Sequence, residues 1–268
     1  MIRVLKHIRV LALSLLAMPA LAQESDLVEA RILTGWRLPD GTHQAGLEIR
    51  LRDGWKTYWR APGDAGIPPR FNWSGSRNLR AVEVVWPTPR EIDQGGMTTI
   101  GYEKAVILPL RIKPRRDGQS VSLSGEVDMG VCSDVCVPVT LSLDQDLPRS
   151  ATKPDPRIIA ALASRPYSAQ EAGVSRVACR ISPAKDGLHL RAEIDLPGTG
   201  GRELAVIETS DPNIWVAPAK TTRQGGRLVA EVDMYHVDGR SFALDRSGLR
   251  ITVLGRGSAV DIQGCPAG

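Results

Sequence analysis

The chain has 268 residues, of which 42% are hydrophobic, with 34 basic and 30 acidic side chains and a formal net charge of +4. This length allows one large domain or two smaller ones. Because the basic residues form no cluster or stripe, the composition argues against a nucleic-acid partner.

The first 22 residues have the organisation of a signal peptide. Arg3, Lys6 and Arg9 precede an apolar run at residues 10–16, and a small-x-small pattern ends at Ala22. We therefore predict cleavage after Ala22 and export to the periplasm. The alternative is an uncleaved anchor, but the run is shorter than the roughly 20 residues that span a bilayer. Three of the basic residues fall in this segment, so the exported part is close to neutral.

Short runs in which apolar and polar residues alternate follow the signal, as is typical of strands with one buried face. In the first half we expect strands at residues 27–38, 44–52, 79–87, 105–112, 121–128 and 137–143. Residues 88–103 are expected to form a loop. The pattern predicts an all-β fold.

An aromatic segment, residues 54–73, begins as a strand and continues into a stretch rich in Pro and Gly. Trp55, Tyr58, Trp59 and Trp73 could fill a sandwich core, since such rings bury large apolar areas. They could instead form an exposed platform for a glycan or a protein, which would make the chain a non-catalytic binding module.

A polar, Pro-rich segment at residues 148–173 is predicted to be a linker. Asp155 before Pro156 is typical of a helix N-cap followed by Pro at the first helical position, so a short helix should extend to about residue 164. Ile158, Ile159 and Leu162 could line its buried face. Further short strands are expected at residues 174–182, 187–195, 203–209, 213–217, 227–233, 248–254 and 258–263. We predict two immunoglobulin-like β-sandwich domains joined by a short helical linker, the second over residues 174–268.

The chain has four cysteines, and paired cysteines of an exported protein normally oxidise. Cys179 lies in the first strand of the second predicted sandwich and Cys265 just after its last strand. Because first and last strands are often neighbours, we expect a structural Cys179–Cys265 disulfide. Such a bond would close a long loop.

Cys132 and Cys136 are only four residues apart. In one continuous strand they would lie about 13 Å apart, whereas a disulfide needs Cα atoms within roughly 4.4–6.8 Å. If they bond, the chain must reverse through residues 133–135. A bond that closes so small a loop restrains the unfolded chain little, so we interpret this pair as a redox site.

The local sequence around this pair is acidic, with Asp128 and Asp134 close by and no basic residue within three positions. The pair should therefore act as a disulfide that a more reactive partner attacks. An alternative is Cu(I) binding by Cys132, Cys136 and Met129, because soft sulfur ligands suit this ion. A closed zinc site is not expected, and we predict no cofactor.

Several separated motifs resemble one family: GWKTYWRxPGDxG at 54–66, FxW at 71–73, WP at 86–87, GYE at 101–103 and VCSDVCVP at 131–138. They are similar to the periplasmic N-terminal domain of the thiol:disulfide interchange protein DsbD. The similarity is stronger to its variant in suppressor-of-copper-sensitivity protein B. The resemblance runs over about residues 25–145, within the first predicted domain, residues 23–147.

The resemblance implies a thiol–disulfide oxidoreductase component that takes reducing equivalents from a membrane electron carrier. It would pass them to periplasmic thioredoxin-like proteins. Cys136 would form the mixed disulfide with partners and Cys132 would resolve it. A cap loop near residues 92–101 would shield the pair, with Met97 and Tyr102 as shielding residues. The family usually continues into a membrane domain and a thioredoxin-like domain. We find no counterpart of either in this sequence, so we expect the electron donor to be a separate polypeptide.

Overall fold

The structure is a computed structural model that describes residues 26–268; the predicted signal peptide and its cleavage site lie outside these residues. The described part contains strands β1 to β19 and one helix, α1, which confirms the all-β class. No helix within residues 26–268 has the length and apolar character needed to cross a membrane.

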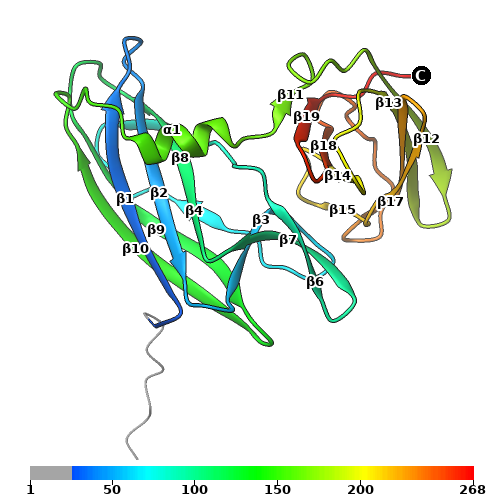
Figure 1. Cartoon of the computed structure of the whole chain (residues 1–268), viewed down its shortest axis with the longest axis horizontal. Coiled ribbons are helices and arrows are strands. Elements are labelled where there is room, and N and C mark those ends of the chain that lie inside the picture. Colours follow the sequence, from blue (N-terminus) through cyan, green and yellow to red (C-terminus); the bar gives the residue numbers. More distant parts are fainter. Residues whose placement is uncertain (1–25) are drawn as a thin grey trace, which may run out of the picture.

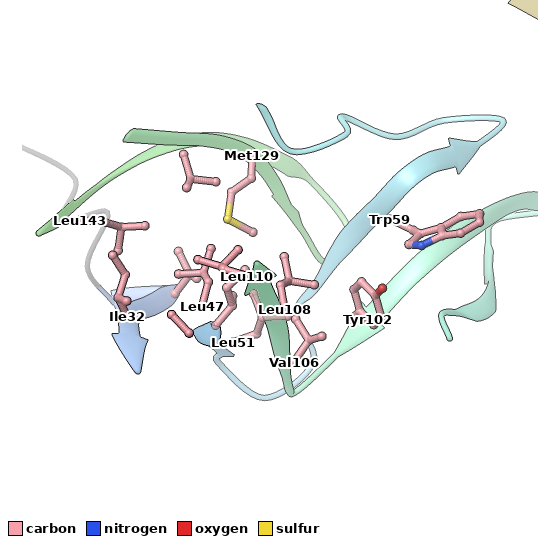
Figure 2. Packing of buried hydrophobic residues seen from close by; sticks show 14 of the residues in the cluster. Ile32, Leu47, Leu51, Trp59, Tyr102, Val106, Leu108, Leu110, Met129 and Leu143 are labelled. Atoms are coloured by element: carbon pink, nitrogen blue, oxygen red, sulfur yellow. The ribbon is translucent and has the colours of Figure 1, made fainter. Parts of the chain in front are cut away.

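Two antiparallel sheets built from residues 28–147 enclose the first hydrophobic core (Figure 1). The first sheet has the order β1 (Val28–Arg37), β2 (His43–Leu51), β8 (Ala105–Pro114), β5 (Leu79–Val84). The second has the order β10 (Cys136–Leu147), β9 (Val121–Cys132), β3 (Lys56–Gly63), β7 (Met97–Glu103), β6 (Arg90–Gln94), and β4 (Arg70–Asn72) also pairs with β9. Figure 2 shows side chains of both sheets meeting, with Leu47, Leu108 and Leu110 opposite Met129 and Leu143.

The prediction of a loop over residues 88–103 was wrong, because this segment forms the hairpin β6–β7. Gly95 and Gly96 make its turn with φ of +63° and +89°, a region that favours glycine. Ile92 is half-buried and its partner Thr99 is buried. More buried and more exposed positions therefore alternate along β6, but most of its residues are polar. The low apolar content of β6 hid this strand from the hydrophobic pattern.

Helix α1 (Pro156–Ala163) begins where its capping residues predict. The Asp155 carboxylate accepts a 2.9 Å hydrogen bond from the Arg157 amide. Only Ile158 is fully buried, in a cluster with Leu33 and Trp36, whereas Ile159 is exposed, contrary to the expected face. The helix therefore lies against the outside of the first sheet, as Figure 1 shows.

Two more sheets, built from residues 167–263, enclose a second core. One has the order β11 (Tyr167–Ser168), β19 (Ala259–Gln263), β18 (Arg250–Leu254), β14 (Leu204–Glu208). The other has the order β12 (Arg176–Ala184), β13 (Gly187–Asp195), β17 (Arg227–His236), β15 (Ile214–Val216), with β16 (Lys220–Gln224) also paired to β17. The strands β4, β11 and β16 had not been predicted, because each is too short or too polar to show a clear period.

The two sets of sheets meet at β3. Leu254 and Ala259, from β18 and β19, belong to the same buried cluster as Trp59 of β3, and Leu204 packs against it. Arg60, the next residue of β3, forms hydrogen bonds to Glu208 and Thr252. Strand β3 is thus held from one side by the first core and from the other by β14, β18 and β19.

Candidate functional site

Cys132 and Cys136 form a disulfide at the tip of the β9–β10 hairpin. They are direct cross-strand neighbours, with Cα atoms 4.1 Å apart. The chain reverses between them through Ser133, Asp134 and Val135, and the Ser133 amide donates a 3.0 Å hydrogen bond to the Val135 carbonyl. The short loop therefore places both sulfurs at one end of the second sheet.

The two cysteines differ in their access to solvent. Cys132 lies on β9, which has β10 on one side and β3 on the other, and it is 0% exposed. Cys136 begins the edge strand β10 and is exposed. An incoming thiolate must reach one sulfur along the S–S axis, so this geometry offers the Cys136 sulfur to a partner and protects Cys132.

Tyr58 is the side chain whose contact with the disulfide is most direct. Its hydroxyl lies 3.4 Å from the Cys136 Sγ and 3.4 Å from Oε1 of Gln94 on β6. Since neither a disulfide sulfur nor an amide oxygen carries a hydrogen, the single hydrogen of the Tyr58 hydroxyl is shared between Gln94 Oε1 and Cys136 Sγ. Burial raises the pKa of Tyr58, which keeps the hydroxyl protonated and able to donate.

The loop after β3 covers the Tyr58 ring. A Cβ added to Gly66 would lie 2.6 Å from that ring, and one added to Gly130 would lie 2.8 Å from the Ile67 side chain. The Ile67 carbonyl also accepts a 3.4 Å hydrogen bond from the Gly130 amide. Residues 64–67 thus hold Tyr58, which is 1% exposed, against the disulfide end of the sheet.

Lys56 is a second residue that the local sequence did not connect with the site. In the β3–β9 pairing it stands directly opposite Cys132, and in the β3–β7 pairing opposite Glu103. It lies two residues before Tyr58, so the two side chains leave β3 on the same face. Lys56 is 9% exposed. The acidic surroundings inferred from neighbouring residues therefore omit a basic residue that comes from 76 residues earlier in the chain.

The shielding role expected for Met97 and Tyr102 needs correction in part. Tyr102 pairs with Thr57, so its ring leaves the sheet on the face opposite Lys56 and Cys132 and lies in the core beside Trp59 (Figure 2). Its hydroxyl donates a 2.7 Å hydrogen bond to the Pro87 carbonyl. Met97 stands at the tip of the β6–β7 hairpin and is 44% exposed. Within the segment expected as a cap, residues 92–101, Gln94 is the side chain linked to the disulfide, because the Tyr58 hydroxyl contacts both Gln94 and Cys136.

The alternative Cu(I) ligand set is not brought together. Met129 lies three residues before Cys132 on β9 and so points to the other face, into the core, where it is 1% exposed (Figure 2). Among residues 26–268 there is also no group of three or more His, Cys, Asp or Glu side chains placed to hold a metal ion.

The aromatic platform is not present either. Tyr58 and Trp59 are buried, and Trp55 and Trp73 pack against the first core. Phe71 stacks on Trp73 with ring centroids 6.1 Å apart. The aromatic segment therefore supplies core and supports the site, in agreement with the first of its two interpretations.

Cys179 and Cys265 form a second disulfide, with Cα atoms 5.6 Å apart. Both are buried in the second core. The chain end is also tied there, because the Cys179 amide donates a 2.8 Å hydrogen bond to the Pro266 carbonyl. In contrast to the tip pair, this disulfide has no exposed sulfur to offer a partner.

Comparison with known families bears on the tip disulfide. Residues 25–148 match the family model described as "Thiol:disulfide interchange protein DsbD, N-terminal". The resemblance predicted from the motifs is confirmed. Both Cys132 and Cys136, and the strands β3, β6, β7, β9 and β10 around them, lie inside the matched segment.

Solved structures extend the comparison. The N-terminal periplasmic domain of ScsB from Proteus mirabilis matches with a TM-score of 0.69 and 24% identity, covering 94% of this chain and 96% of that one. The fold is therefore shared along nearly the whole chain, including the C-terminal sheets. The DsbD N-terminal domain of Neisseria meningitidis, in its reduced form, matches with a TM-score of 0.29 and 16% identity over 51% of this chain and 96% of that one. A search of curated protein sequences found no match.

Proposed function

We propose that this protein is a periplasmic thiol–disulfide exchange module. It relays reducing equivalents through Cys132 and Cys136 between a membrane electron carrier of the DsbD type and thioredoxin-like periplasmic proteins. The observation that carries the proposal is the asymmetry of the tip disulfide, with an exposed Cys136 and a buried Cys132 inside a DsbD-type domain.

The asymmetry assigns different steps to the two sulfurs. In the reduced protein, the Cys136 thiolate attacks the disulfide of an oxidised partner, forming a mixed disulfide and releasing the partner's other sulfur as a thiolate. The Cys132 thiolate then attacks the Cys136 sulfur, the bond to the partner breaks, and the Cys132–Cys136 disulfide forms. The partner gains two electrons, which the donor later restores to this chain by the reverse exchange.

We further propose that the redox unit is residues 23–147, that residues 148–173 with α1 connect it to a second sandwich at 174–268, and that the signal is removed after Ala22. The match to the ScsB periplasmic domain supports export of a protein with this fold. Leu254 and Ala259 belong to the same buried cluster as Trp59, which supports a role for the C-terminal sheets in holding β3, the strand that carries Tyr58.

Trapping of the mixed disulfide tests this function. Reduced Cys132→Ser protein, expressed in the periplasm of the host bacterium, should accumulate disulfide-linked complexes with thioredoxin-like proteins, because Cys136 can attack but nothing resolves the product. The matched control is Cys136→Ser, which should trap almost none since Cys132 is buried. Equal trapping by the two variants, or none by either with a range of oxidised partners, would refute the proposal.

A Cu(I) titration of the reduced protein tests the copper alternative. The two thiols lack Met129 as a third ligand, so we expect binding no tighter than that of a Cys132→Ser/Cys136→Ser variant. Tight binding that depends on both thiols would restore copper handling as a function.

A further inference from the structure

Lys56 is a largely buried residue whose ammonium nitrogen is not among the fully buried polar atoms without a hydrogen bond. Its residue is 9% exposed, and among residues 26–268 it takes part in no ion pair within 4 Å and in no side-chain hydrogen bond. The neighbouring strands therefore cover the aliphatic stem of Lys56 while its ammonium keeps contact with solvent, as lysine side chains commonly do. An anion that forms beside this ammonium during function can therefore pair with it.

The residue directly opposite Lys56 is Cys132. Directly opposed residues of antiparallel strands have Cβ atoms about 4.5–5.5 Å apart and point to the same face. The contact of the Tyr58 hydroxyl with Cys136 confirms that the disulfide and this face of β3 coincide. A lysine side chain at this position can bring its ammonium to the Cys132 sulfur.

We propose that Lys56 stabilises the Cys132 thiolate and so accelerates the step in which Cys132 resolves the mixed disulfide. This role rests on the proposed function. Cys132 needs such help because it is 0% exposed, and burial without a cation disfavours a thiolate. In the Cys132–Cys136 disulfide the Cys132 sulfur carries no charge, so Lys56 has no anion to pair with. Lys56 therefore stabilises the reduced, thiolate state of Cys132 relative to the disulfide.

Other charged groups around Lys56 oppose this effect or lie further off. Glu103 on β7 is the other cross-strand neighbour, and it is exposed. Asp134 in the tip loop is exposed as well, and Tyr58 on β3 stays neutral because burial raises its pKa. The two carboxylates would disfavour the thiolate. Within the described residues, Lys56 is the cation that the strand register places beside Cys132.

A titration that needs no partner protein measures the effect. In full-length Cys136→Ser protein, Cys132 is the only thiol outside the Cys179–Cys265 disulfide, and its thiolate absorbs near 240 nm. An added cation within 4–6 Å typically lowers a thiol pKa by about 1 unit or more. Lys56→Met should therefore raise the midpoint by about 1 unit, whereas Lys56→Arg should leave it close to that of Cys136→Ser alone. Lys113→Met, an exposed lysine of β8, is the control for loss of one charge.

Resolution is measured with glutathione disulfide and acid quench in protein that keeps both cysteines. A tenfold smaller thiolate fraction is partly offset by the higher nucleophilicity of the more basic thiol, so Lys56→Met should resolve the mixed disulfide about threefold more slowly at pH 7. Unchanged midpoint and resolution rate in a folded Lys56→Met protein would overturn this role. If instead no protein partner is ever trapped, the proposed function fails while the titration result stands.

Discussion

Arg60 of β3 and Glu208 of β14 are 148 positions apart in the sequence and form a bidentate ion pair, with two hydrogen bonds of 3.0 Å. The guanidinium also stacks on the Trp59 ring, 3.8 Å from its centroid, and donates a 3.2 Å hydrogen bond to Thr252. This pair fastens the strand that carries Lys56 and Tyr58 to the C-terminal sheets. The strand beside the tip disulfide is thus supported by a part of the chain that is distant from it in sequence.

Replacing Arg60 should lower the stability of the folded protein. Arg60→Met leaves the Glu208 carboxylate partly buried without a partner, which should lower the free energy of unfolding by about 2–3 kcal/mol, somewhat less than for a fully buried pair. Arg111→Met is the control, because its pair with Glu83 is largely exposed and should contribute less than about 1 kcal/mol. Urea denaturation measures both; similar losses would show that Arg60–Glu208 is not a fastening point.

Tyr58→Phe should alter the reactivity of Cys136 without disturbing the fold. The ring keeps its place beneath residues 64–67, but the hydroxyl that lies 3.4 Å from the Cys136 Sγ is lost. A hydrogen bond to a thiolate favours it, so the reduced variant should attack an oxidised partner several-fold more slowly near pH 7. Stopped-flow reduction of a small disulfide measures this. An unchanged rate with an unchanged pH profile would leave Tyr58 with a packing role alone.

The two disulfides should differ strongly in their effect on stability. Cys179–Cys265 spans 86 positions, so the Cys179→Ala/Cys265→Ala variant should lose about 4–5 kcal/mol in the chain-entropy model. Cys132–Cys136 spans only 4, so Cys132→Ser/Cys136→Ser should lose about 2 kcal/mol or less by the same relation. Chemical denaturation of the two double variants compares these losses in the free energy of unfolding. A larger loss for the tip pair would indicate a structural role for it and contradict a redox role.

His43 should make stability depend on pH. Burial lowers the pKa of His43 and Arg37 lowers it further, although the 2.6 Å hydrogen bond from Nε2 to the Thr34 carbonyl opposes both effects. The folded protein therefore resists protonation while the unfolded chain accepts a proton below about pH 6.5. Stability should fall as the pH decreases from about 6.5 toward the lower folded pKa.

The variant His43→Gln separates this effect from the rest of the chain. Thermal unfolding of wild type should show a Tm that decreases between about pH 7.5 and pH 5, and the decrease should be smaller in the variant, because its side chain does not titrate. The same pH dependence in both proteins would exclude His43 as its source.

The sequence determined the local features of this protein. Alternation of apolar and polar residues predicted most strands, Asp155 and Pro156 predicted the start of α1, and the distance that two bonded cysteines tolerate predicted the reversal at residues 133–135. These features depend on residues close in sequence, on strand periodicity and on capping chemistry. The polar hairpin β6–β7 escaped because its strands have too few apolar residues to show a period.

Only the tertiary structure decided what surrounds the tip disulfide. The pairing of β3 with β9 brings Lys56 opposite Cys132, and the loop at 64–67 presses Tyr58 toward Cys136. The same one-residue alternation sends Met129 and Tyr102 to the core and away from the sulfurs. Which strand lies beside which, and in what register, depends on packing across the whole sheet, so no local pattern contains it.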